Sequence, residues 1–173
     1  MIIRKAASED IDEIGKLYDA LNDHLASHIN YPGWVKGIYP TGKDAEAGLE
    51  ENTLYVAEKD RAVAGTFILR HKPEPAYSEA DWKVPHSYDE IYVLYTLAVH
   101  PDYLGQHIGD QIMEYIIDLA EKESMKAVRL DVYEKNIPAI RLYEKHGFQY
   151  IDTVDLGYSQ YGLDRFRLYQ YIL

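Results

Sequence analysis

The stretch from Leu97 to Gly109 most constrains how this chain can fold. An apolar, β-branched run over Ile91–Val99 predicts a buried strand. Gly105 and Gly109 then bracket a short loop, and a helical pattern follows over 109–123. A strand, a glycine-bearing loop and a helix start form an anion site, because free backbone N–H groups and the positive end of the helix dipole point at one spot. The sequence therefore predicts a site for a phosphate-bearing group.

Two common phosphate-binding patterns do not fit this loop. No Lys-Ser or Lys-Thr pair follows the second glycine, which excludes a Walker-type P-loop. The loop also lacks the first Gly-x-Gly pair and the later acidic residue of a dinucleotide-binding fold. An ordinary strand-to-helix turn remains the alternative interpretation of the two glycines.

A second informative segment runs from Asp131 to Phe148. Asn136 stands where a predicted strand over Ala127–Val132 gives way to a predicted helix over 137–146. Pro138 fits the first turn of that helix. Gly147 is typical of the left-handed residue that ends a helix, and Phe148 starts the next strand.

These two segments, in this order and at this separation, resemble the acetyl-CoA-binding motifs of the GCN5-related N-acetyltransferase (GNAT) family. The first resembles the Arg/Gln-x-x-Gly-x-Gly/Ala signature, with Leu104 where the family has Arg or Gln and His107 where it has Gly. The second resembles the pattern Asn-x-x-Ala-x-x-x-Tyr-x-x-x-Gly-Phe. The chain matches that pattern at Asn136, Ala139, Tyr143, Gly147 and Phe148.

The resemblance implies the fold class. It implies a single α/β domain over residues 1–173, with a mixed, mostly antiparallel sheet of about seven strands and about four helices. The N-terminal stretch Ile2–Ile11 also resembles the first strand and helix start of the family. In such a fold the fourth and fifth strands diverge at their ends, and the pantetheine arm of the cofactor pairs between them.

Local patterns predict the other elements. Apolar residues at helical spacing over Ile11–Leu25 predict a helix with Ser8 as its N-cap, and Thr41 with Asp44 predicts a capping box before a short helix. The segment from His71 to Asp89 (the 71–89 segment) is long, polar and proline-rich, with a tryptophan, Trp82, that we expect to be exposed. The remaining strands are predicted at Ile2–Lys5, Leu54–Glu58, Ala62–Arg70, Gln149–Asp155 and Phe166–Ile172.

The resemblance also implies which residues contact acetyl-CoA. Backbone N–H groups hold the pyrophosphate, a backbone N–H of the fourth strand faces the thioester carbonyl, and an asparagine holds backbone or pantetheine amides. The pyrophosphate-binding residues are Leu104, Gly105, Gln106, His107, Ile108 and Gly109. The fourth-strand residues that face the carbonyl are Leu97, Ala98 and Val99, and the cofactor contacts of the second motif are Asn136, Ala139 and Tyr143. Asn136 is also a candidate helix cap.

Acetyl transfer further needs an acid for the leaving thiolate and a base for the amine. Tyr143 is the candidate acid, with simple packing as its alternative role. Glu90 is the candidate base, although an acid at a strand start is often merely solvated, and Tyr92 or Tyr95 could relay a proton through water.

Trp34, Tyr39 and Tyr95 are the candidate acceptor-binding residues. The segment from Asn30 to Pro40 is a Gly/Pro-punctuated loop that carries Trp34 and Tyr39, and the resemblance places the acceptor wall there. Covering the hydrophobic core is the alternative role of its aromatic side chains.

Composition narrows the function classes. The chain has no cysteine, which excludes disulfides, thiolate metal sites and an acetyl-cysteine intermediate. The formal net charge of −11 disfavours nucleic acid and anionic membranes as partners. That charge would favour a cationic amine, although solubility is its simpler explanation. His24 and His28 lie four residues apart without a third ligand, so we expect no metal.

No apolar run approaches the length of a membrane span, so the predicted location is the cytoplasm. The sequence thus predicts an acetyl-CoA-dependent N-acetyltransferase that acts on a primary amine by direct transfer in a ternary complex. The alternative is a catalytically weak acyl-CoA-binding or sensory module on the same fold. The acceptor remains open among polyamines, amino sugars, amino acids and peptide amines, and so does a homodimer.

Overall fold

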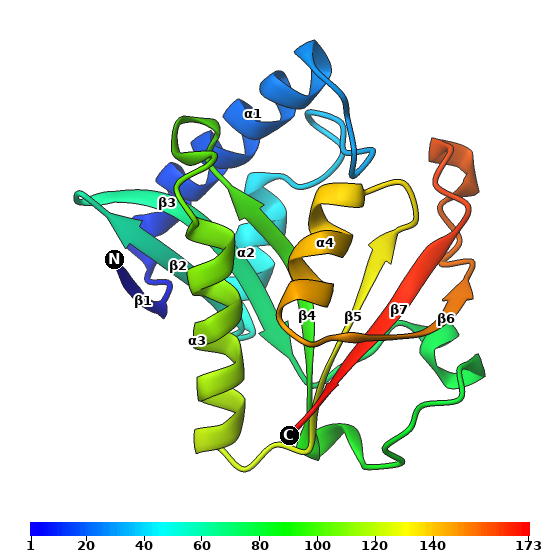
Figure 1. Ribbon diagram of the computed structural model, residues 1–173. Helices are drawn as coiled ribbons and strands as arrows, with labels where there is room; N and C mark the ends of the chain where they lie inside the picture. The colour runs from blue at the N-terminus through cyan, green and yellow to red at the C-terminus, as the bar shows by residue number, and fades with distance from the viewer. The chain divides into compact units, whose positions relative to one another are not determined.

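The computed structural model describes all 173 residues of the chain (Figure 1). A seven-stranded sheet has the strand order β1-β2-β3-β4-β5-β7-β6, and the chain forms four α-helices. β4 and β5 pair in parallel, whereas β1–β2, β2–β3, β5–β7 and β6–β7 pair antiparallel. The predicted α/β class with a mixed sheet is therefore confirmed.

The observed bounds agree with most of the predicted ones. The strands are β1 (Ile2–Lys5), β2 (Leu54–Lys59), β3 (Ala62–Arg70), β4 (Ile91–Val99), β5 (Ala127–Tyr133), β6 (Gln149–Val154) and β7 (Phe166–Ile172). The helices are α1 (Ile11–Ser27), α2 (Gly42–Glu50), α3 (Ile108–Lys122) and α4 (Ile137–Lys145).

The chain divides into two compact units. Unit 1 comprises Met1–Asn30, Trp34–Leu69 and Tyr95–Ile112. Unit 2 comprises Tyr31–Gly33, Arg70–Leu94 and Met113–Leu173. The single domain that the resemblance implies stays a prediction.

In unit 1, α1 contributes one apolar face to a core that it shares with β2 and β3. The side chains of Ile14, Leu17 and Tyr18 are essentially inaccessible to solvent. The β2–β3 hairpin is confirmed. Its turn residues Asp60 and Arg61 have φ angles of 53° and 66°, the left-handed pair that matches the twist of a tight hairpin.

The predicted N-cap of the first helix is wrong. Ser8 lies in a 3₁₀ turn over Ser8–Asp10, and α1 begins at Ile11. Asp10 occupies the N-cap position of α1, but its side chain caps no N–H of the helix. Its carboxylate instead accepts the Ala7 N–H at 2.7 Å and a guanidinium hydrogen bond from Arg4 at 2.7 Å. Three-residue spacing in the sequence does not distinguish a 3₁₀ entry from a regular first turn.

The capping box before α2 is confirmed. The Thr41 N–H donates to the Asp44 carboxylate at 2.7 Å, and the Asp44 N–H donates back to the Thr41 carbonyl at 3.0 Å. This reciprocal pair satisfies backbone donors that a helix start otherwise leaves free.

In unit 2, β7 lies between β5 and β6, as the red strand of Figure 1 shows. The 71–89 segment contains a short 3₁₀ helix over Pro75–Glu79. The expected exposure of Trp82 is wrong, because its ring lies 4.2 Å from the guanidinium of Arg129 and its Nε1 donates to the Tyr77 carbonyl at 2.7 Å. The indole thus packs against β5, which local polarity could not reveal.

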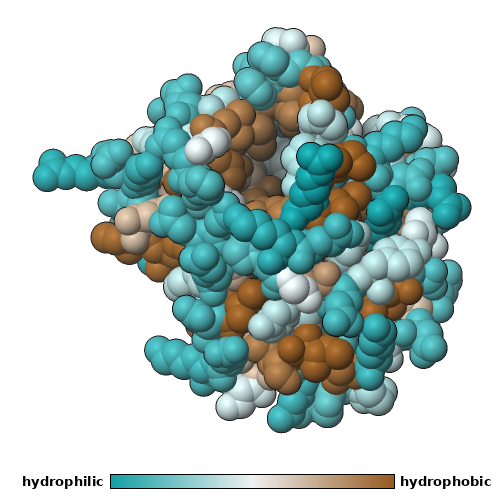
Figure 2. Space-filling model, in the orientation of Figure 1, coloured by the Kyte–Doolittle hydropathy of each residue, from teal (hydrophilic) through white to brown (hydrophobic).

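The surface view is mostly hydrophilic, with apolar residues gathered in patches (Figure 2). None of the helices combines the length and hydropathy that crossing a bilayer requires.

Candidate active site

The loop after β4 in unit 1 has the predicted strand–loop–helix geometry, and α3 begins at Ile108, one residue before the predicted start. Gly105 and His107 both have left-handed backbones, with φ angles of 74° and 60°. A side-chain Cβ built on Gly105 would meet no atom within 4 Å, so space is open beside the loop. The first turn of a helix leaves backbone N–H groups free for an anion.

The left-handed backbone at position 107 explains why the signature that this loop resembles has a glycine there. A left-handed conformation costs a non-glycine residue roughly 1 kcal/mol. The imidazole is well exposed, and its Nδ1 lies 3.0 Å from the carboxylate of Asp110. The Asp110 charge suits the helix dipole but opposes a bound anion.

Lys59 is a residue of this site that the sequence did not indicate. Its ammonium donates to the Gln106 side-chain carbonyl at 2.6 Å, and the Gln106 amide donates to the Asp102 carbonyl at 3.0 Å. Lys59 ends β2, far from the loop in sequence, so only the fold brings its charge there. Open space, backbone N–H groups and a lysine together fit a pyrophosphate.

β4 carries a kink next to the predicted carbonyl-binding residues. Thr96 has a φ of 50° and is 8% exposed, which is a strained conformation for a β-branched residue. Its hydroxyl forms a hydrogen bond with the hydroxyl of Tyr39. Of the neighbouring residues, Ala98 is buried, whereas Leu97 and Val99 are partly buried.

The structure brings the predicted acceptor aromatics together within unit 1. The rings of Trp34 and Tyr39 meet edge to face with centroids 5.7 Å apart. Trp34 and Tyr95 are partly buried and pack against the core around α1. Asn30 fixes the loop, because its side chain donates to the Trp34 carbonyl at 2.7 Å. This packing fits the alternative role of these aromatic side chains, which is to cover the hydrophobic core. Their acceptor-binding role stays a prediction.

The second motif lies in unit 2 and has the predicted helix ends. The Asn136 side-chain oxygen accepts the Ala139 N–H at 3.4 Å, so its capping role is confirmed. Gly147 has a φ of 84° and ends α4. The Phe148 N–H then donates to the Tyr143 carbonyl at 3.1 Å.

Tyr143, the candidate acid, is 7% exposed, and its ring centroid lies 6.2 Å from that of Phe148. Burial raises the pKa of the Tyr143 phenol, and the negative charge of Asp131 raises that pKa further. The phenol is therefore protonated at neutral pH.

Asp131 is the second residue that the sequence did not single out. Its carboxylate accepts a hydrogen bond from the Tyr77 hydroxyl at 2.7 Å. Burial raises the pKa of Asp131 to about 6, and the charge of Glu74 adds to that effect, although the Tyr77 hydrogen bond opposes it. A carboxyl group with a pKa near the working pH is a candidate general base. Its hydrogen-bond partner Tyr77 comes from the 71–89 segment, which no local pattern could place there.

Glu90, the base expected from the sequence, has a more solvated environment. Its side chain is 46% exposed, and one oxygen lies 3.3 Å from the Nδ1 of His86. Tyr92 donates to the carboxylate of Glu123 and stacks on His71 at 4.8 Å.

His24 and His28 stack with ring centroids 4.0 Å apart. The Nδ1 of His28 lies 2.8 Å from the His24 carbonyl oxygen. No group of three or more His, Cys, Asp or Glu side chains is arranged to hold a metal ion.

Comparison with known proteins gives a family. The model of the acetyltransferase (GNAT) family matches residues 18–148. The probable N-acetyltransferase camello from Xenopus laevis is 37% identical over 102 residues, which cover 58% of this chain and 41% of that protein. The ribosomal protein bS18-alanine N-acetyltransferase of Escherichia coli K12 is 42% identical over 55 residues, 32% of this chain and 37% of that enzyme. These matches span less than half the length of either relative.

A solved structure supports the fold. The yncA protein of Salmonella typhimurium, whose structure contains its cofactor acetyl-CoA, superposes with a TM-score of 0.68 at 20% identity and covers 99% of this chain and 93% of that one. The match over residues 18–148, with the seven-stranded sheet and both motif segments in place, shows that this chain belongs to the acetyltransferase (GNAT) family.

Proposed function

We propose that the protein is an acetyl-CoA-dependent N-acetyltransferase that acetylates a primary amine by direct transfer in a ternary complex. The main support for this proposal is the motif around Tyr143 and the environment of its phenol. Its motif is complete, its phenol is buried and protonated, and its pKa responds to the charge of a neighbouring carboxylate, Asp131. Because the chain has no cysteine, an acetyl-cysteine intermediate cannot form.

The loop over Leu104–Gly109 is the proposed pyrophosphate clamp. Bound acetyl-CoA would supply the acetyl thioester. Backbone N–H groups of this loop hold phosphate oxygens at little entropic cost, because they need no side-chain ordering. Lys59 adds positive potential beside the loop through its contact with Gln106. A backbone N–H near Leu97–Val99 is the proposed hydrogen-bond donor to the thioester carbonyl.

Asp131 is the proposed general base. With a pKa of about 6, the carboxylate is ionised at neutral pH yet basic enough to accept a proton from the incoming ammonium group. Glu90 remains the alternative base. Variants at the two positions separate Glu90 from Asp131.

Asp131 and Tyr143 would act in sequence. While Asp131 is ionised, its charge holds the phenol proton of Tyr143 more tightly. Once Asp131 has taken a proton, that charge disappears and the pKa of Tyr143 falls. The phenol then becomes a better proton donor at the stage when the thiolate needs one.

The proposed acceptor-binding residues within unit 1 are Trp34, Tyr39 and Tyr95. The E. coli relative carries an alanine of a ribosomal protein in its name, which supports an amine acceptor of some kind. The net charge of −11 would favour a cationic amine.

A catalytically weak acyl-CoA-binding or sensory module is the second candidate function. His107, held at a φ of 60°, and Asp110 in the first turn of α3 both favour it, because each weakens an anion site. Release of free thiol from acetyl-CoA, measured over a panel of primary amines, separates the two. Amine-dependent release supports the transferase. Tight CoA binding without amine-dependent release supports the module.

A further inference from the structure

The 71–89 segment and β5 form a pocket of about 480 Å³ in unit 2. Its lining includes Glu74, Tyr77, Trp82, Tyr88 and Arg129. We call it the Arg129 pocket. Aromatic walls with a few convergent polar groups are typical of small-molecule sites.

Arg129 is a buried cation without an anionic partner. Its side chain is 2% exposed. One terminal nitrogen donates to the Tyr88 hydroxyl at 2.8 Å and the other donates to the Val84 carbonyl at 2.6 Å, both uncharged oxygens. The guanidinium lies 4.2 Å from the Trp82 ring and 5.1 Å from the Tyr88 ring, and its Nε has no hydrogen-bond partner. Buried charges are normally paired, so this arrangement favours an anion from outside the chain.

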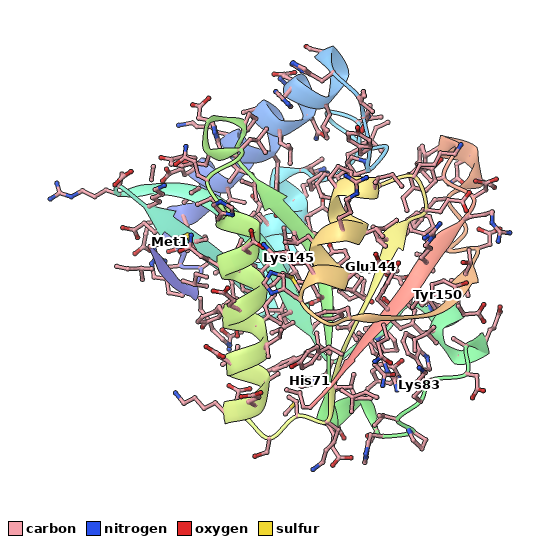
Figure 3. The ribbon with its side chains drawn as sticks, viewed as in Figure 1. Met1, His71, Lys83, Glu144, Lys145 and Tyr150 are labelled. Carbon is pink, nitrogen blue, oxygen red and sulfur yellow. The ribbon has the colours of Figure 1, made fainter.

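The residue opposite Arg129 on β7 also has buried polar atoms without hydrogen-bond partners. Gln170 is the register partner of Arg129, and directly opposite residues of antiparallel strands share a face of the sheet. Gln170 is 1% exposed, and neither its amide nitrogen nor its amide oxygen has a partner. On β6, Gln149 follows in register and accepts a hydrogen bond from Lys83 at 3.1 Å (Figure 3, where Lys83 and the neighbouring Tyr150 are labelled).

A carboxylate stands two residues further along β5. Residues two apart on a strand share a face and lie about 7 Å apart, so Asp131 belongs to the same face as Arg129. The ring of Tyr77, which donates to Asp131 at 2.7 Å, lies 5.3 Å from the ring of Trp82, which covers Arg129. Arg129 and Asp131 therefore lie at opposite ends of the Tyr77–Trp82 pair, and they form no ion pair with each other.

We propose that the Arg129 pocket binds an amino acid acceptor, with its carboxylate against Arg129 and its ammonium group toward Asp131 and Glu74. The apolar part of the ligand packs on the rings of Tyr77 and Trp82. A planar guanidinium matches a carboxylate through paired hydrogen bonds, which gives geometric selectivity as well as affinity. This assignment rests on the proposed transferase function and names its substrate class.

The ammonium group loses one proton to the general base, which passes it to solvent. The amine nitrogen forms a bond to the acetyl carbon and the carbon–sulfur bond breaks with its electron pair on sulfur. The thiolate gains a proton from the acid, and the second proton that the nitrogen loses restores the acid. The products are the N-acetyl amino acid, free thiol and one proton.

The test compares amines that differ only at the carboxylate. L-leucine, L-phenylalanine and 4-aminobutyrate are each assayed beside the corresponding primary amide. We expect kcat/KM to be about 10- to 100-fold higher for at least one free acid than for its amide, which is the usual size of a charged hydrogen bond. Equal values for acid and amide in every pair would overturn the assignment while leaving the transferase intact.

Variants provide a second arm. Arg129→Met keeps the side-chain volume and should abolish the preference for the acid, and Arg129→Lys should restore part of it. Arg165→Met removes an exposed cation that pairs with Glu134, outside the lining of the pocket, and should leave the preference unchanged. If Arg129→Met lowers stability but keeps the acid preference, Arg129 only fastens the segment to the sheet and the proposal fails.

Binding without turnover separates the two proposals. If no amine releases thiol, the transferase proposal fails, and calorimetric titration of the unmodified protein with L-phenylalanine and with its amide still decides the pocket. Saturable binding of the acid alone supports the pocket. Binding of neither ligand, or of both equally, overturns it.

Discussion

The hydroxyl of Tyr77 donates a 2.7 Å hydrogen bond to the carboxylate of Asp131. It connects the segment before β4 with the face of β5, and it ties the ionisation of a partly buried carboxyl group to the position of that segment. The same carboxylate raises the pKa of Tyr143, so the ionisation of Asp131 also affects the phenol of the candidate acid.

Replacing Asp131 should change activity and stability in opposite directions. Because its folded pKa is raised to about 6 from the ordinary 3.8, its stabilising contribution is complete below about pH 4 and is lost as the pH rises through 6. Asp131→Asn should therefore raise the free energy of unfolding by about 1–3 kcal/mol at pH 7.5 and leave it nearly unchanged at pH 4. Urea unfolding at both pH values measures this.

The pH dependence of acetyl transfer tests the base. In the unmodified protein, kcat/KM should fall as the pH drops through about 6, because the base must be ionised. Asp131→Asn should abolish this limb along with most of the activity. Glu90→Gln is the matched control and should keep it. A limb that disappears in Glu90→Gln instead would make Glu90 the base.

Tyr143→Phe should lower turnover far more than it weakens cofactor binding. A lost general acid typically costs about 10²–10⁴-fold in rate. Tyr171→Phe is the control, because Tyr171 is a second phenol against the same ring, 5.4 Å from Phe148. Steady-state kinetics with acetyl-CoA, together with calorimetry of CoA binding, gives both quantities. Normal turnover in Tyr143→Phe, with chemistry rate-limiting, means that Tyr143 only packs.

Gly105→Asp should abolish CoA binding, because it brings a negative charge and bulk into the open space beside the loop. Gly157→Asp is matched to it. Gly157 also has a left-handed backbone, with a φ of 85°, and open space at its Cβ position, so it reproduces the strain and the charge at a different loop. Unchanged calorimetric affinity in a folded Gly105→Asp protein would exclude this loop as the phosphate site.

His107→Gly should improve both stability and CoA binding. Removing the side chain relieves a left-handed non-glycine residue and should add up to about 1 kcal/mol to the free energy of unfolding. His107→Ala loses the same contact with Asp110 but keeps a Cβ at a φ of 60°. If His107→Ala raises the free energy of unfolding and CoA affinity as much as His107→Gly does, the cause is the lost Asp110 contact rather than backbone strain.

Local patterns predicted the elements because local forces decide them. The β-branched run over Ile91–Val99, the Asn136 cap and the Gly147 stop each act within a few residues, and each lies where the sequence indicated. The entry to α1 was mistaken at Ser8, since a 3₁₀ turn and a regular first turn share their early spacing.

The sequence by itself determined the sheet-and-helix architecture, the glycine loop and the Tyr143 motif, because backbone conformation and amphipathic spacing are local properties. Tertiary structure alone decided the electrostatics. Lys59 reaches Gln106 from the end of a distant strand, and Tyr77 and Glu74 surround Asp131 from a segment more than 40 residues away. A pKa depends on burial and on charges that only the folded chain brings together, so neither the candidate base nor the Arg129 pocket could be predicted from the sequence.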